Sequence, residues 1–137
     1  MIWKVAVELK TKQREGVIMG VNQLETTQAN HPFIGIWHIY EMSEWDEDYF
    51  NMETQAYIEI QTNNLGTFQF GLVYGSLDGY LEQVNGQQRF TFTWEGQDEM
   101  DEAMGNGWLQ LESDNEVEGF IKFHLGDDST FRATRAS

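Results

Sequence analysis

From residue 35 onward, hydrophobic and polar side chains alternate in short runs along the chain. Phe90, Phe92 and Trp94, for example, are separated by Thr91 and Thr93. Successive side chains of a β-strand point to opposite faces, so this two-residue period predicts strands. We predict eight of them, at residues 35–42, 55–62, 66–74, 77–84, 88–95, 107–112, 116–124 and 129–134.

Residues that favour turns separate the predicted strands. They are Asn63-Asn64-Leu65-Gly66, Gly75-Ser76, Asn85-Gly86, Ser113-Asp114-Asn115 and Gly126-Asp127-Asp128. The spacing leaves no room for helical crossovers, which predicts an all-β antiparallel meander. Eight such strands can close into an up-and-down barrel, which removes the unpaired sheet edges. A sandwich of two sheets is the alternative architecture.

The inward side of this barrel is expected to be bulky, because it collects many aromatic side chains. Side chains of that size can fill an eight-stranded barrel, so a large cavity is not assured. Glu41 has the same parity as Trp37 and Ile39 and is therefore predicted to point inward. A buried carboxylate needs a partner or a raised pKa, which makes Glu41 a candidate functional residue.

The region before residue 35 differs from the rest of the chain. Residues 22–30 are polar and predict a short helix that ends before Pro32. Residues 1–18 hold four basic and two acidic residues, whereas residues 19–137 hold four basic and 21 acidic ones. We therefore divide the chain into an extension, 1–18, and a barrel domain, 19–137. The extension is either an added strand or a non-native segment.

Composition narrows the range of partners. The formal net charge of −15 disfavours nucleic acids and anionic membranes and favours cationic ligands or basic proteins. The chain contains no cysteine, no hydrophobic run long enough to span a membrane and no pattern typical of a signal peptide. These features predict a cytoplasmic protein, without a cofactor or a metal. The sequence does not predict its oligomeric state.

The first predicted strand begins with Gly35-Ile36-Trp37 and follows a short predicted helix. This tripeptide resembles the Gly-X-Trp signature of the calycin barrels, which are the lipocalins and avidins. The resemblance implies that Trp37 closes one end of the barrel and that an arginine of the last strand packs across it. Parity selects Arg135 as this partner, with Arg132 second. The lipocalin Thr-Asp-Tyr motif and the avidin biotin-site pattern are not evident.

About residues 20–136 also resemble a family of uncharacterised bacterial proteins. The matching stretches are residues 41–46, 55–59, 94–99 and 124–131. This resemblance implies no established activity.

Residues 43–54 form the most informative predicted loop, because they join the first two strands and are too many for a hairpin turn. Trp45 and Tyr49 lie there among carboxylates that include Asp46. Aromatic faces and carboxylates suit a cationic ligand, through cation–π contact and charge. The alternative is a loop that plugs the barrel with its own aromatic side chains.

Residues 95–106 are predicted to form a second acidic loop, with Glu95, Asp98, Glu99, Asp101 and Glu102. Their spacing does not match an EF-hand, so a solvated loop is favoured over a metal site. In an up-and-down meander, the connection between the first two strands and the connection between strands five and six lie at the same end. Counting connections therefore predicts one acidic mouth.

We consider three functions. The leading hypothesis is a non-enzymatic binding module for a small cationic or amphipathic ligand, contacted by Glu41, Trp45, Asp46, Tyr49, Trp94 and His124. The second is an acidic protein-interaction module that mimics a polyanion or docks a basic partner. The third is a small hydrolase or isomerase that uses Glu41, or His124 with Asp127, as acid or base. It would require those side chains to converge in one pocket.

Overall fold

The computed structural model describes residues 30–136. The chain divides into two compact units, Met1–His31 and Pro32–Ser137, and every described strand lies in the second. The predicted extension, 1–18, and the predicted helix, 22–30, lie outside the described residues except for Asn30.

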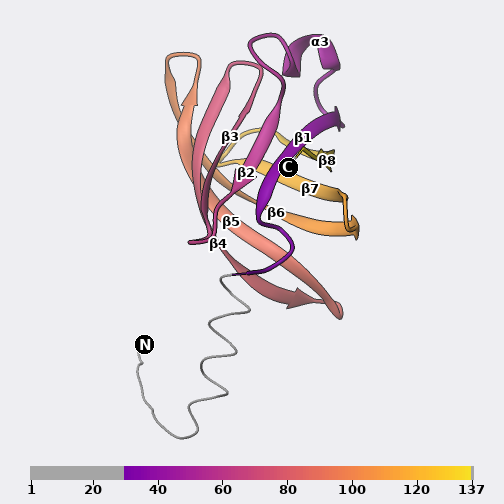
Figure 1. Cartoon of the computed structure of the whole chain (residues 1–137). Helices are drawn as coiled ribbons and strands as arrows, with labels where there is room; N and C mark the ends of the chain where they lie inside the picture. Colours follow the sequence, from indigo (N-terminus) through magenta and orange to yellow (C-terminus); the bar gives the residue numbers. More distant parts are fainter. Residues whose placement is uncertain (1–29, 137) are drawn as a thin grey trace, which may run out of the picture. The chain divides into compact units, whose positions relative to one another are not determined.

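Eight antiparallel strands form a closed barrel, in which each strand pairs with the next and β8 pairs with β1 (Figure 1). The predicted up-and-down barrel is confirmed, and the sandwich alternative is wrong. The elements are β1 (Gly35–Met42), α3 (Glu47–Phe50), β2 (Tyr57–Ile60), β3 (Leu65–Phe70), β4 (Val73–Val84), β5 (Gln87–Asp98), β6 (Asp101–Ser113), β7 (Glu116–Phe123) and β8 (Asp128–Arg135).

The hairpin between β4 and β5 shows why the turn signals were informative. Asn85 and Gly86 have φ values of 53° and 81°. A two-residue hairpin of type I′ requires positive φ at both central residues, and an Asn-Gly pair meets that requirement at little cost. The predicted turn at this position is confirmed.

Two other predicted connections are wrong. At the predicted turn Gly75-Ser76, the glycine is needed for packing and not for a turn. Gly75 lies inside β4, where a Cβ atom would come within 2.5 Å of the Phe68 ring. The chain turns earlier, at Gly71 and Leu72. Similarly, residues 95–106 are not a loop: β5 and β6 continue until Asp98 pairs with Asp101.

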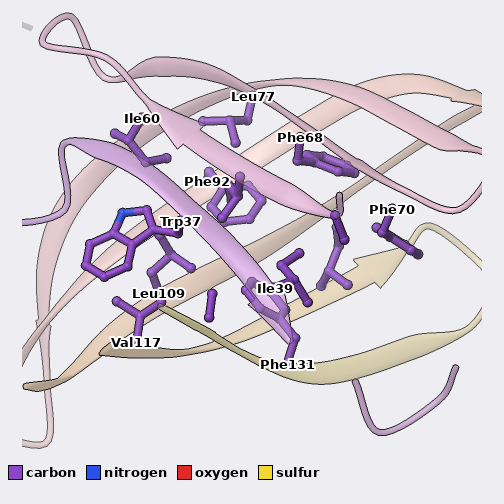
Figure 2. Packing of buried hydrophobic residues seen from close by; sticks show 14 of the residues in the cluster. Trp37, Ile39, Ile60, Phe68, Phe70, Leu77, Phe92, Leu109, Val117 and Phe131 are labelled. Carbon is purple, nitrogen blue, oxygen red and sulfur yellow. The ribbon is translucent and has the colours of Figure 1, made fainter. Parts of the chain in front are cut away.

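Aromatic and aliphatic side chains fill the barrel. Figure 2 shows Phe68, Phe92 and Leu77 inside the barrel, together with Trp37. A cavity of only about 10 Å³ remains between the side chains of Ile39, Met42, Ile58, Phe68, Phe70, Ile121 and Phe131. This is about the least space that holds one water molecule. The described barrel therefore has a filled interior, and any ligand site must lie on its rim or its outer face.

A β-bulge places Glu41 outside the barrel. The pairing of β1 with β8 shifts register between Ile39 and Glu41, so the alternation of inward and outward side chains changes phase. Met42 consequently points inward and is 7% exposed, whereas Glu41 is exposed to solvent. The prediction of an inward Glu41 is wrong for this reason.

Candidate functional site

The connection between β1 and β2 carries the short helix α3 at the upper end of the barrel in Figure 1, where the orange β5–β6 hairpin also turns. Asp46 is the N-cap of this helix, and its carboxylate accepts a hydrogen bond of 3.1 Å from the backbone N–H of Tyr49. An N-cap carboxylate satisfies a donor that the helix leaves unpaired. Asp46, a predicted ligand contact, is therefore occupied with shaping the loop.

Trp45 and Tyr49 close the mouth of the barrel. Their ring centroids are 6.1 Å apart, and the Trp45 ring lies 5.1 Å from Phe70 and 6.1 Å from Phe123. Both side chains are half-buried, so each rests on the core and keeps a part exposed. The alternative interpretation of residues 43–54, as a plug made of aromatic side chains, describes this arrangement.

The neighbouring turn holds the plug in place. The N–H of Gly71 donates to the carbonyl of Phe50 at 2.9 Å, and the N–H of Leu72 donates to the Tyr49 hydroxyl at 3.4 Å. Gly71 has a φ of 59°, and a Cβ atom there would lie 2.3 Å from the Tyr49 ring. Glycine is therefore required at this turn for both backbone conformation and space.

A groove of about 340 Å³ lies beside the plug, and we call it the mouth groove. Trp45, Tyr49 and Phe123 supply its aromatic wall. Its remaining lining residues are Val73, Asp98, Asp101, Glu102, Ala103, Met104, His124, Gly126 and Asp127. The β1–β2, β5–β6 and β7–β8 connections contribute to it, and counting connections predicted that the first two lie at the same end.

The mouth groove is electrically negative. Within the described part of the chain, four carboxylates line it, together with the imidazole of His124 and no lysine or arginine. Burial raises the pKa of the Tyr49 phenol, and the charges of Asp98 and Glu99 raise it further, against the opposing hydrogen bond from Leu72. Among residues 30–136, no group of three potential ligand side chains is arranged to hold a metal ion.

The predicted contacts separate in the structure. Trp45, Tyr49 and His124 come together at the mouth groove. Trp94 lies in the wall between barrel interior and outer face, where its indole N–H donates to the carbonyl of Lys122 at 3.2 Å. Glu41 does not line the mouth groove and shares a small surface hollow with residues that include Glu118 and Arg132. His124 and Asp127 line one groove, but Glu41 does not join them.

Asp98, Asp101 and Glu102 were not among the predicted contacts, although with Asp127, a candidate only for the hydrolase hypothesis, they supply the charge of the mouth groove. The assumed loop at residues 95–106 gave no fixed direction to its carboxylates. The signal that locates them is the count of connections, which places both acidic segments at one end.

Gly35-Ile36-Trp37 lies at the opposite end of β1. Gly35 has a φ of 133°, which only glycine adopts readily. Trp37 is fully buried, and it is the direct cross-strand partner of Arg135.

Searches against protein-family profiles, curated proteins and solved structures found no match to this chain. Among the described residues, no helix is long and apolar enough to cross a membrane.

Proposed function

We propose that this protein is a binding module that takes a small organic cation in the mouth groove. The observation that carries the proposal is the meeting of an aromatic wall, Trp45 and Tyr49, with carboxylates from two hairpins in one concavity. An ammonium group gains from an aromatic face by cation–π contact and from the carboxylates by charge. The groove volume of about 340 Å³ suits a small ligand.

The charge distribution of the barrel supports a cation over an anion. The three arginines of the described residues hold other contacts: Arg89 lies over Trp108, Arg132 lies near Glu116 and Arg135 lies over Trp37. Among residues 30–136, no arginine or lysine lines the mouth groove. A cation entering it therefore meets attraction from every ionised carboxylate, with repulsion only from a protonated His124.

The test compares tetramethylammonium with tert-butanol, which has a similar shape and no charge, by calorimetric titration of the full chain. We expect saturable binding of tetramethylammonium only, weakening as salt rises because the carboxylates are exposed to solvent. Asp101→Asn and Trp45→Leu should each weaken binding at least about threefold. Glu112→Gln removes the same charge from an exposed site outside the groove and should leave binding unchanged. Equal binding of both probes would contradict the proposal.

A second function, docking of a basic protein, is favoured by the hairpin tips beside the mouth groove. Met100 and Leu125 are 93% and 91% exposed, next to the acidic lining. Apolar tips among carboxylates match a basic, amphipathic partner surface. The test is whether the chain captures a basic protein. Loss of that capture at high salt, and also in the double variant Met100→Ser, Leu125→Ser, would support protein docking over binding of a small cation.

We also propose a relationship to the calycin barrels. The support is the fold together with Gly35, the buried Trp37 and its neighbour Arg135. This proposal concerns descent and architecture, and it assigns no ligand.

A further inference from the structure

A second, larger concavity of about 640 Å³ lies on the outer face of the barrel, and we call it the outer groove. It crosses strands β3 to β7. One row of directly paired residues runs along it, formed by Leu65, Asp78, Thr93, Asn106 and Lys122. The parallel row contains Ser76, Glu95 and Met104, and His124 lies beyond it.

The two ends of the outer groove carry opposite charges. Asp78 and Glu95 supply carboxylates on β4 and β5, whereas Lys122 and His124 lie at the β7 end. Thr93 and Asn106, between them, offer neutral hydrogen-bonding groups. Lys122 is the one lysine of residues 30–136; its direct cross-strand partner on β8 is Asp128, but it forms no ion pair within 4.0 Å with another described residue. The groove thus offers an unpaired ammonium on a strongly acidic barrel.

This polarity favours a zwitterion over a simple anion or a long polycation. The protein's net charge of −15 repels a free anion from Lys122. A long polycation is repelled by Lys122 itself and suits the mouth groove better. A molecule with one positive and one negative end, and no net charge, satisfies both ends of the outer groove.

Strand spacing sets the length of such a molecule. Neighbouring strands lie about 4.8 Å apart, so Glu95 and Lys122, two strands apart, are separated by about 10 Å along the groove. Asp78 and Lys122, three strands apart, are separated by about 14 Å. An extended peptide advances about 3.4 Å per residue. A peptide of about three or four residues would therefore reach from one charged end of the outer groove to the other.

We infer that the outer groove binds a linear zwitterion, with its ammonium at Asp78 and Glu95 and its carboxylate at Lys122. A short peptide with free termini and an ω-amino acid of the same length share this chemistry. The central side chains of Thr93 and Asn106 are placed to contact peptide amides, which an alkyl chain lacks. This inference is tested separately from the proposed mouth-groove function, because Asp78, Glu95 and Lys122 do not line the mouth groove, although His124 and Met104 line both grooves.

The experiment titrates the full chain with tetraalanine, with 8-aminooctanoic acid and with N-acetyl-tetraalanine amide, whose ends are uncharged, and follows backbone amide resonances by NMR. We expect the first or second compound to shift the resonances of residues 93–106 and 122, and the blocked peptide to have no effect. Shifts by tetraalanine alone identify a peptide, shifts by 8-aminooctanoic acid alone identify an ω-amino acid, and shifts by both support the shared chemistry. No shift by either charged compound overturns the inference.

Variants test the contacts. Lys122→Met should weaken binding at least about threefold, and Lys122→Arg should preserve most of it, since the positive charge remains. Asp78→Asn with Glu95→Gln should weaken binding similarly, while Glu112→Gln should not. These side chains point outward from the barrel, and a denaturation curve checks that each variant is folded. Binding that is unchanged in Lys122→Met overturns the inference, whatever the mouth groove does with tetramethylammonium.

Discussion

The guanidinium group of Arg135 lies across the indole ring of Trp37, with Cζ 4.2 Å from the ring centroid. Its N–H groups also donate to the backbone carbonyls of Pro32, Ile34 and Asp114, at 2.8 to 3.1 Å. The Trp37 indole in turn donates to the carbonyl of Phe33 at 2.9 Å. One side chain of the last strand thus joins three segments around the start of the first strand.

Arg135→Met should therefore destabilise the fold by about 2 kcal/mol, through the loss of the cation–π contact and of the hydrogen bonds. Arg135→Lys keeps the charge but not the planar fork of donors, so about half of that loss is expected. Urea denaturation measures both. Arg132→Met is the control, because Arg132 pairs with Glu116 at 3.7 Å on the exposed surface and should change stability much less than Arg135→Met does. Equal losses for Arg135→Met and Arg132→Met would contradict the closing role of Arg135.

The bulge in β1 gives a second prediction, because it reverses the roles expected for two neighbouring residues. Met42→Ala should cost about 2–3 kcal/mol, since Met42 is 7% exposed and its truncation leaves a cavity. Glu41→Ala should change stability by less than about 0.5 kcal/mol, since Glu41 is exposed. Thermal unfolding of the two variants measures the difference. The opposite order would show that the uninterrupted alternation is correct.

The sequence predicted the barrel because the alternation of side chains repeats over eight strands and the turn residues agree with it. It failed at two places. One is the bulge that shifts the inward and outward alternation of β1, and the other is a glycine that lies inside a strand and not in a turn. The sequence around Glu41 does not indicate the bulge, because the bulge depends on how β1 pairs with β8. Likewise, Gly75 resembles a turn residue, but the Phe68 ring of the adjacent strand determines that no larger residue fits there.

The negative charge of the candidate site was predictable, but only some of its residues were. Composition indicated an excess of carboxylates, and the loop that holds Trp45 and Tyr49 was identified directly. The role of Asp46 as a helix cap required knowledge of a one-turn helix, for which the local pattern is too short. The side-chain directions of the carboxylates on β5 and β6 could not be predicted, because they depend on these strands continuing to the hairpin at Glu99 and Met100.

A third prediction concerns the contact between Gly71 and Tyr49. Gly71→Ala must place a methyl group where the Tyr49 ring lies and must also hold alanine at a φ of 59°. Gly86→Ala is a matched control, because Gly86 has a φ of 81° and a methyl group added there would meet no atom within 4 Å. The conformational strain of about 1–2 kcal/mol is common to both variants. Gly71→Ala should lose at least about 1 kcal/mol more, because the plug must move.

Denaturation curves measure this difference, and near-ultraviolet circular dichroism reports the environment of Trp45 and Tyr49. Only Gly71→Ala should alter that spectrum and weaken binding of tetramethylammonium. Identical behaviour of the two variants would mean that the turn does not hold the plug.

The last prediction is a loss of stability at high pH that depends on Tyr49. Burial, with the charges of Asp98 and Glu99, raises the pKa of this phenol above 10.0, its ordinary value. The folded protein therefore keeps the proton in a range where the unfolded chain has released it. This stabilisation is fully present below pH 10 and declines as the pH rises through the raised pKa of the folded state. Tyr49→Phe has no phenol to ionise and should show a smaller decline above pH 10.

Tyr40 provides the comparison, because its pKa is also raised, mainly by the hydrogen bond to Glu116, but on the outer surface. Absorbance at 295 nm follows tyrosinate formation, and each of Tyr49→Phe and Tyr40→Phe should remove one late-titrating group. Asp98→Asn should lower the titration midpoint of Tyr49 and leave that of Tyr40 unchanged, because only Tyr49 lies beside Asp98. An unchanged Tyr49 titration in Asp98→Asn would show that the mouth groove does not concentrate negative charge at the plug.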